Sequence, residues 1–517
     1  MSNEQKLSEL ITQVEQVNPK LEDHWQTMAI VESLGYTDLI IKEEFGFADV
    51  LEIGQYIYQK NSTSTASKKS PSPSPSNFSW SKNAIAEIFA FIEQFSRSFV
   101  YAIPLISLLI LGNVESTETW KFIPPQLAAI FTLATLASLI TSGGFVQTIS
   151  RRGEFYLGLG YSLQAKRACI SLLGLGMLTS FILALISLWF GFYCGLFPDE
   201  YLIIGAIYYL ILSLLWMLLS ILSLQTIWGT PLALIGLTTL SWGLKLVGSL
   251  GALEAQIVAI SITLFFIAIA VLILFREPKN TALAQEKVEL PNLSATFYLL
   301  TPFFAYGITY FCFIFADRLV AGWSVDIASG LTFAINSAYQ RAMDLALLNF
   351  LLIVPLSEYL AYRLIRYWYK QAKLVEFEAM AILSKKLNRG YLLIVSVLML
   401  ICGLSIALIT ITFNPQPEAS TDLFLSLSGC LGYLLLAIGL LNAVILFSLD
   451  LAPDVISTLF PSLLVNLVVG YIAANAIAPE WAVLGLIIGS SVFLYFSQRK
   501  VSQAMQNPDY VYFLGGY

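Results

Sequence analysis

SRRGEFYLGLGYSLQAKR, residues 150–167, is a basic stretch that stands between two long apolar runs. A second stretch of the same kind, RLIRYWYKQAKLVEFEAMAILSKKLNR at 363–389, carries seven Lys and Arg residues. Around these two stretches, from about residue 85 to 497, lie roughly twelve apolar segments that are long enough to cross a bilayer, singly or with tilt. The sequence therefore predicts an all-α polytopic membrane protein with about 12 transmembrane helices.

The charge of the connections alternates along the chain and predicts an orientation. Basic stretches follow the second, sixth and eighth predicted helices, whereas GNVESTETWKF at 112–122 is acidic and NPQPEASTD at 414–422 has no base. Because Lys and Arg are enriched in cytoplasmic loops, both termini are expected in the cytoplasm. The short loop at 450–454 is acidic but is assigned inside by its place in the order. We expect a multi-pass protein of the cytoplasmic (inner) membrane.

Composition excludes several functional classes. The chain is 57% hydrophobic and 12% charged, with a mean hydropathy of +0.74, whereas soluble domains carry about 25% charged residues. This balance excludes a nucleic-acid binder, which needs a basic face. The single histidine, His24, lies outside the membrane segments, and the five cysteines show no CxxC spacing. With no Walker A loop either, we expect no metal, no cofactor and no enzymatic activity.

Five regions follow from these patterns. Residues 1–60 hold 11 acids and 4 bases and read as a small acidic helical cytoplasmic domain, with helices broken at Gly35 and Gly46. A Ser/Pro-rich linker at 61–78 follows, which is too polar to pack. We then expect a first six-helix membrane repeat at 79–290, a second at 291–505, and a cytoplasmic tail at 506–517.

The two membrane halves share one feature, a basic connection, at the same place in the order of helices. Predicted helix two passes through a basic connection into helix three, and helix eight passes through a longer one into helix nine. An even number of helices per half gives parallel repeats, which are related by an axis along the membrane normal. Two such halves can rock about a central cavity, which is alternating access.

Ionisable residues inside apolar runs are candidate pathway or coupling residues, because charge is costly in a bilayer. Lys245, in predicted helix five, either meets an anionic substrate or extends to the outer interface. Asp317 and Arg318, at the outer end of predicted helix seven, are either a coupling carboxylate with its partner or an exposed interfacial pair. Residues 317–341 are expected to form an outer, partly polar segment.

Predicted helix eight, at about 343–362, adds three candidates. Arg341 and Asp344 stand at its start, and Glu358 follows Pro355 by three residues. Proline frees a backbone carbonyl and kinks a helix, so a carboxylate one turn beyond it is a candidate ion site. The alternative for Glu358 is an interfacial charge beside Arg363.

Four tyrosines lie deeper in the apolar runs than the others, and sugars bind to aromatic faces together with hydroxyl groups. We therefore take them as candidates for lining a glycan path, while most other aromatics fit interface belts. These four are Tyr208, Tyr209, Tyr306 and Tyr310.

The chain resembles the multidrug/oligosaccharidyl-lipid/polysaccharide flippase superfamily, and within it most resembles the Pel-type exopolysaccharide exporter membrane component. The resemblance covers about residues 85–505 and excludes the acidic domain and linker. It rests on GITYFCFIFADRLVAGW at 307–323, YQRAMDLALLNFLLIVPLSEYLAYRLIRYWYKQ at 339–371, SRRGEFYLGLGYSLQAKRA at 150–168 and LLNAVILFSLDLAPDVISTLFPSLLVN at 440–466.

The resemblance implies export of a polysaccharide or flipping of a lipid-linked glycan, without ATP hydrolysis by this chain. It also implies a cytoplasmic glycosyltransferase partner, for which the acidic domain offers a docking point. Two alternatives stay open. One is a membrane glycosyltransferase or ligase using a lipid-linked donor, which needs a sizeable folded outer segment. The other is a non-transporting scaffold of a polysaccharide synthase complex, which only the acidic domain supports.

Overall fold

The protein divides into a small N-terminal unit, Met1–Ser76 together with Leu374–Ala379, and a large helical unit that holds the rest of the chain. Its structure is a computed structural model. The structure describes residues 7, 10–14, 24–65, 91–92, 95, 125–195, 197–226, 228–248, 252–275, 293–323, 337–372, 375, 379–413 and 420–508. The first predicted membrane helix, at about 85–111, falls almost entirely outside these residues.

The N-terminal unit is a set of short helices around its own core. Its helices are α2 (His24–Ser33), α3 (Asp38–Glu44) and α4 (Val50–Thr65). The predicted breaks at Gly35 and Gly46 are confirmed, and both residues have positive φ, which glycine adopts without steric cost. Helix α4 runs past residue 60, so the expected linker at 61–78 begins with five helical residues. The buried core consists of Leu10, Val14, Ile30, Val31, Ile41, Val50, Ile53 and Ile57.

The large unit is built from long apolar helices, and the described residues contain ten that are long and apolar enough to cross a membrane. This is a multi-pass membrane protein. We call the first group of helices the first lobe and the second group the second lobe. The first lobe consists of α7 (Pro125–Gly158), α8 (Ser162–Cys194), α9 (Asp199–Gln225), α10 (Gly229–Gly248) and α11 (Ala252–Leu274). The second lobe consists of α12 (Leu293–Trp323), α13 (Ser337–Ala372), α14 (Met380–Phe413), α15 (Ser420–Ser448), α16 (Ala452–Ala476) and, after the turn η6 (Pro479–Ala482), α17 (Val483–Gln506).

The helices match the predicted segments in order, but several are longer than hydropathy alone indicates. The basic stretch after predicted helix two is mostly helical, because α7 continues to Gly158 and α8 starts at Ser162. The predicted bounds of the outer segment, 317–341, are wrong. Helix α12 continues to Trp323 and α13 begins at Ser337, so both ends of this range are helical. Asp317 and Arg318 stay inside the bundle because side chains of α13 pair with them, which a hydropathy window does not register.

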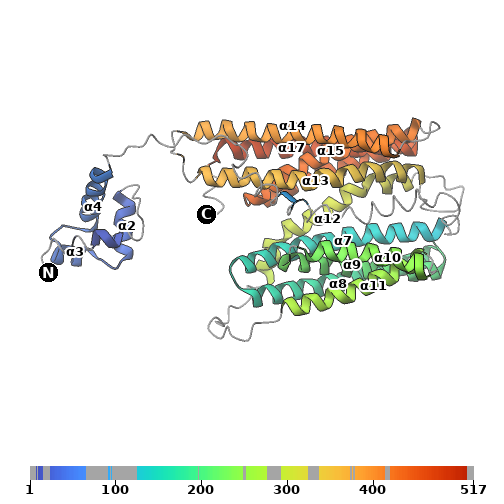
Figure 1. Ribbon diagram of the computed structural model, residues 1–517, viewed down its shortest axis with the longest axis horizontal. Helices are drawn as coiled ribbons and strands as arrows, with labels where there is room; N and C mark the ends of the chain where they lie inside the picture. The colour runs from blue at the N-terminus through green and yellow to red at the C-terminus, as the bar shows by residue number, and fades with distance from the viewer. Residues whose placement is uncertain are drawn as a thin grey trace. The chain divides into compact units, whose positions relative to one another are not determined.

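The packing of the two lobes repeats. In the first lobe α7 packs against α8 and α9, α9 packs against α11, and α10 packs against α11. In the second lobe α13 packs against α14 and α15, α15 packs against α17, and α16 packs against α17. The same neighbours recur six helices later along the chain, as the predicted parallel repeat requires. Figure 1 shows the lobes as two groups of long helices, with α12 beside α7.

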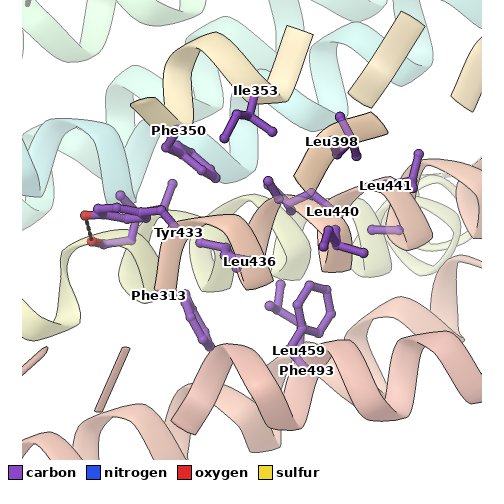
Figure 2. Packing of buried hydrophobic residues seen from close by; sticks show 14 of the residues in the cluster. Phe313, Phe350, Ile353, Leu398, Tyr433, Leu436, Leu440, Leu441, Leu459 and Phe493 are labelled. Atoms are coloured by element: carbon purple, nitrogen blue, oxygen red, sulfur yellow. Dashed lines mark hydrogen bonds between the residues drawn. The ribbon is translucent and has the colours of Figure 1, made fainter. Parts of the chain in front are cut away.

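Each lobe has its own buried apolar core. In the second lobe α15 is central, because Tyr433, Leu436 and Leu440 project between α13 and the helices on its other side. Figure 2 shows these residues between Phe350 of α13 and Phe493 of α17. Burial of these side chains supplies dispersion and close packing rather than a hydrophobic force, because lipid is as apolar as the core.

Helix α12 connects the lobes through a close crossing with α7. A Cβ atom on Gly307 would lie 2.2 Å from the carbonyl oxygen of Gly143, so the two backbones touch. Phe311 and Phe304 of α12 cover Gly143 and Gly144 on either side of this contact. Small residues at such a crossing allow the helices to approach closely in a membrane.

The basic connections lie at one end of the large unit. Arg151, at the end of α7, pairs with Asp450, and Lys500 of α17 pairs with Asp454 at N–O distances of 3.5 and 2.9 Å. Lys166 of α8 donates a hydrogen bond of 3.3 Å to the carbonyl oxygen of Phe275, just after α11. The acidic loop at 450–454 thus lies beside bases.

Candidate functional site

A cluster of charged side chains lies between α12 and α13 in the second lobe. The Arg318 guanidinium donates through Nη1 to Asp344 Oδ1 at 2.7 Å, and the exposed fractions of the two side chains are 6% and 21%. Asp317, beside Arg318 in the chain, is fully buried. Removing these charges from water costs several kcal/mol per ion, so their partners decide whether the site is stable.

Tyrosine and glutamine side chains that were not predicted complete this cluster. Tyr339 donates its hydroxyl to Asp317 Oδ2 at 2.8 Å, and Gln340 donates its amide to Asp344 Oδ1 at 3.4 Å. Tyr433 of α15 is buried and interacts electrostatically with Asp317 and Arg318. The sequence signal for Gln340 was its position one helical turn before Asp344, but the prediction of an outer segment at 317–341 concealed it. No sequence signal linked Tyr339 to Asp317, because they lie on different helices.

The cluster retains unused hydrogen-bonding capacity. Among the described residues, Asp317 Oδ1 and Arg318 Nε and Nη2 are buried without a hydrogen-bond partner. A buried carboxylate oxygen without a partner is costly, and proteins keep such groups chiefly where they act. A cation or a proton at Asp317 would satisfy this oxygen. We call Asp317, Arg318, Tyr339, Asp344 and Tyr433 the charge cluster.

A second group of predicted residues meets further along α12. The rings of Tyr306 and Tyr310 are stacked, with centroids 5.8 Å apart and planes 13° apart. Phe447 of α15 lies edge-on to Tyr306 at 4.8 Å. Glu358 of α13 is half-buried and interacts electrostatically with both tyrosine hydroxyls. Glu358 is thus within electrostatic range of an aromatic pair, and we call these three residues the tyrosine–glutamate site.

The first-lobe tyrosines belong to a different environment. Tyr208 accepts a hydrogen bond of 3.0 Å from Gln256 and lies edge-on to Phe131 at 4.7 Å. Tyr209 donates its hydroxyl to Thr141 at 3.0 Å. Both tyrosines are buried between α7, α9 and α11 in the core of the first lobe. They stabilise that core and do not join Tyr306 and Tyr310.

Two charged candidates also lie away from the charge cluster. Lys245 is half-buried on α10, which packs against α9 and α11 of the first lobe. Arg341 is exposed near the start of α13, one turn before Asp344. Of the six charged candidates, the structure therefore brings Asp317, Arg318 and Asp344 together. Within the described residues no group of three or more His, Cys, Asp or Glu side chains could hold a metal ion.

Comparison with solved structures identifies the fold. The chain is similar to an outward-facing multidrug resistance MATE family transporter of the MOP superfamily, with a TM-score of 0.53 and 15% identity over 81% of this chain and 96% of that one. It is similar to a MATE protein in complex with MaL6, with a TM-score of 0.54 and 12% identity over 81% and 97% of the two chains. A mutant of a Vibrio cholerae MATE transporter gives a TM-score of 0.51 and 14% identity over 83% and 100%.

These likenesses define the class of fold. The chain has the fold of these MATE transporters, with two repeats. No protein-family model matches the sequence, and no curated protein matches it. At 12–15% identity the likeness concerns architecture, so the argument for a function depends on the residues of this chain.

Proposed function

We propose that this protein is a membrane exporter or flippase that moves a polysaccharide or a lipid-linked glycan by alternating access, without ATP hydrolysis by this chain. The observation that carries the proposal is a buried, incompletely paired charge cluster inside one lobe of a two-lobe membrane bundle. Such a cluster does not stabilise a helix bundle more than apolar side chains of the same volume would. It is useful where an ion or a proton must bind and leave during each transport cycle.

Alternating access requires two lobes that can separate at one end. The lobes have separate apolar cores, and Arg151 with Asp450 joins them at the end that carries the basic connections. These two side chains are 47% and 65% exposed, so the ion pair is weak and can open readily. Gly143 and Gly307 supply a close crossing about which the lobes can rock.

The glycan substrate is supported by the tyrosine–glutamate site and by the resemblance to the Pel-type exporter component. Aromatic faces stack on sugar rings, and a carboxylate accepts hydrogen bonds from sugar hydroxyls. Tyr306, Tyr310 and Glu358 provide both groups on α12 and α13. A cytoplasmic glycosyltransferase remains the proposed partner, with the acidic N-terminal unit as its docking point.

The alternatives receive less support. A membrane glycosyltransferase or ligase needs a folded outer segment, but helices α12 and α13 reduce the longest predicted outer connection to residues 324–336. A scaffold role is supported by the N-terminal unit alone. Deletion of residues 1–78 would abolish polysaccharide production under the scaffold hypothesis. It would weaken production and leave the bundle competent under ours.

The test measures extracellular polysaccharide in a strain that lacks this chain, complemented with variants. We expect wild type to restore secretion and Asp317→Asn to fail, although the amide keeps the shape of the buried side chain. The matched control is Asp199→Asn, because Asp199 is exposed in the first turn of α9. It should restore secretion fully. Protein levels in the membrane are measured for each variant.

Two results would change this proposal. Secretion unchanged by deletion would exclude glycan export. Export of an amphipathic solute would then be the next candidate, because one similar structure is a multidrug resistance transporter. If both Asn variants restore secretion equally, the proposal of glycan export stands, but Asp317 has no essential role in it.

A further inference from the structure

An apolar groove lies on the surface of the first lobe, between α10, α11 and the end of α9. Its cavity volume is about 860 Å³, within the range of small-molecule sites, which is roughly 300–1,000 Å³. Its walls include Leu222, Leu232, Phe266 and Leu274. Gly236 forms part of the lining, and a Cβ atom there would meet open space. We call this feature the α10–α11 groove.

The groove opens outward from the bundle. Leu232 and Phe266 are 67% and 63% exposed, and Trp228 at its end is 54% exposed. In a chain that spans a membrane, large exposed apolar side chains on spanning helices face lipid. The shape and chemistry of the groove therefore fit a hydrocarbon chain, because its lining is almost wholly apolar.

An interfacial aromatic residue lines one end of the groove, and a positive charge lies near that end. Lys166 donates a hydrogen bond of 3.3 Å to the carbonyl oxygen of Phe275, the residue after Leu274 of the lining. An ammonium group has three donors, so two remain for another acceptor. Thr226 and Trp228, in the connection from α9 to α10, line the groove. Tryptophan prefers the level of lipid headgroups.

We propose that the α10–α11 groove binds a hydrocarbon chain of an anionic membrane lipid, whose phosphate group is bound by Lys166. Charge complementarity identifies the occupant, because a zwitterionic lipid gains little from a cation at this end. Basic sites between membrane helices on the cytoplasmic side bind anionic headgroups in this way. Lys166 lies on the side that we predict to be cytoplasmic. This site lies in the first lobe, away from the charge cluster, and does not depend on the transported substrate.

Fluorescence quenching by brominated lipids tests the site in the full-length protein. Wild type and Trp228→Phe are reconstituted in phosphatidylcholine–phosphatidylglycerol nanodiscs, and the difference between their spectra isolates Trp228. In one set the phosphatidylglycerol chains are brominated, and in the other an equal amount of phosphatidylcholine is brominated. We expect brominated phosphatidylglycerol to occupy the groove with about fivefold preference. Equal quenching by both lipids would overturn the proposal and indicate bulk lipid only.

Three variants assign this preference to the groove and its lysine. Lys166→Gln should abolish the preference, and Lys166→Arg should retain it. Lys385→Gln is the matched control, because Lys385 is an exposed lysine at the basic end of the second lobe. Gly236→Leu should fill the groove and remove the preference without loss of thermal stability. Retention of the preference in Lys166→Gln, or in Gly236→Leu, would contradict the proposal.

Discussion

The two lobes share an arrangement of helices but differ in the polar groups they bury. The buried polar side chains of the first lobe are mostly Ser and Thr hydroxyls, and many bond to carbonyl oxygens of their own helices, as Ser213 does to Tyr209. Its buried arginine, Arg152, also bonds within its own helix, to Tyr156. The second lobe buries Asp317, Arg318 and three asparagines. Among these, Asn466 donates a hydrogen bond of 3.2 Å to the carbonyl oxygen of Phe313 on another helix.

This difference shows that the two lobes can share one arrangement of helices although their buried polar groups need different partners. A hydroxyl that bonds to its own helix adds little cost in lipid and needs no neighbour. Carboxylates, guanidinium and amide groups need partners on other helices, so they restrict how the second lobe can pack. We infer that the repeat preserved the fold in both lobes, and that coupling chemistry developed in the second.

The largest expected effect comes from breaking the charge cluster. Arg318→Met removes the ion-pair partner of Asp344 and leaves buried Asp317 without its neighbouring cation. We expect a loss of about 3–5 kcal/mol in stability, because an uncompensated buried charge remains. The matched change Arg341→Met, at an exposed position on α13, should stay within about 0.5 kcal/mol. Thermal unfolding in detergent measures both, and equal effects would show that the cluster is not a buried unit.

The crossing between the lobes gives the next effect. Gly307→Ala introduces a Cβ atom 2.2 Å from the carbonyl oxygen of Gly143, so α7 and α12 must separate. Overpacking of this kind costs about 1–3 kcal/mol. Gly174→Ala, on α8, meets nothing within 4 Å and should stabilise by up to about 1 kcal/mol. If Gly307→Ala behaves like Gly174→Ala in thermal unfolding, the close crossing is absent in the membrane.

The tyrosines of the two lobes should respond differently. Tyr209→Phe loses the hydrogen bond to Thr141, which costs about 1 kcal/mol in stability, while export per folded molecule is unchanged. Tyr310→Leu removes one face of the stacked pair. We expect export per folded molecule to fall by roughly twofold to tenfold, the equivalent of about 0.5–1.5 kcal/mol. Secreted polysaccharide divided by folded protein measures both effects, and equal ratios would remove the tyrosine–glutamate site from the path.

The smallest effect on stability is expected at the ion pair between the lobes. Asp450→Asn removes the charge while keeping a residue type that tolerates the positive φ of 60°. Because the pair is exposed, the change should cost under about 1 kcal/mol. It should nevertheless increase labelling of a reporter cysteine, Ser448→Cys, by a thiol reagent, since this half-buried position becomes accessible when the lobes open there more often. Unchanged labelling would show that Asp450 does not hold this end closed.

Much of the fold could be predicted from hydropathy and charge. Apolar length and basic connections placed the described membrane helices in order, and the repeat followed from the two basic stretches. Helix ends were less predictable, because α12 continues through Asp317 and Arg318, which hydropathy assigns to a loop. Whether a charge is buried depends on partners from other helices, such as Tyr433, and these are distant in sequence. The sequence therefore identified Asp317, Arg318 and Asp344 as candidates without identifying the network that holds them.

The measurement that tests the account most directly is a cross-link between the lobes at their basic end. Arg151→Cys and Asp450→Cys are combined in a Cys194→Ser background, because Cys194 is the free cysteine that the structure exposes among the described residues. A short bifunctional thiol reagent then joins α7 to the end of α15. Alternating access predicts that polysaccharide secretion stops when both cysteines are joined and continues when either single variant is treated. Undiminished secretion by the fully cross-linked protein would contradict the account.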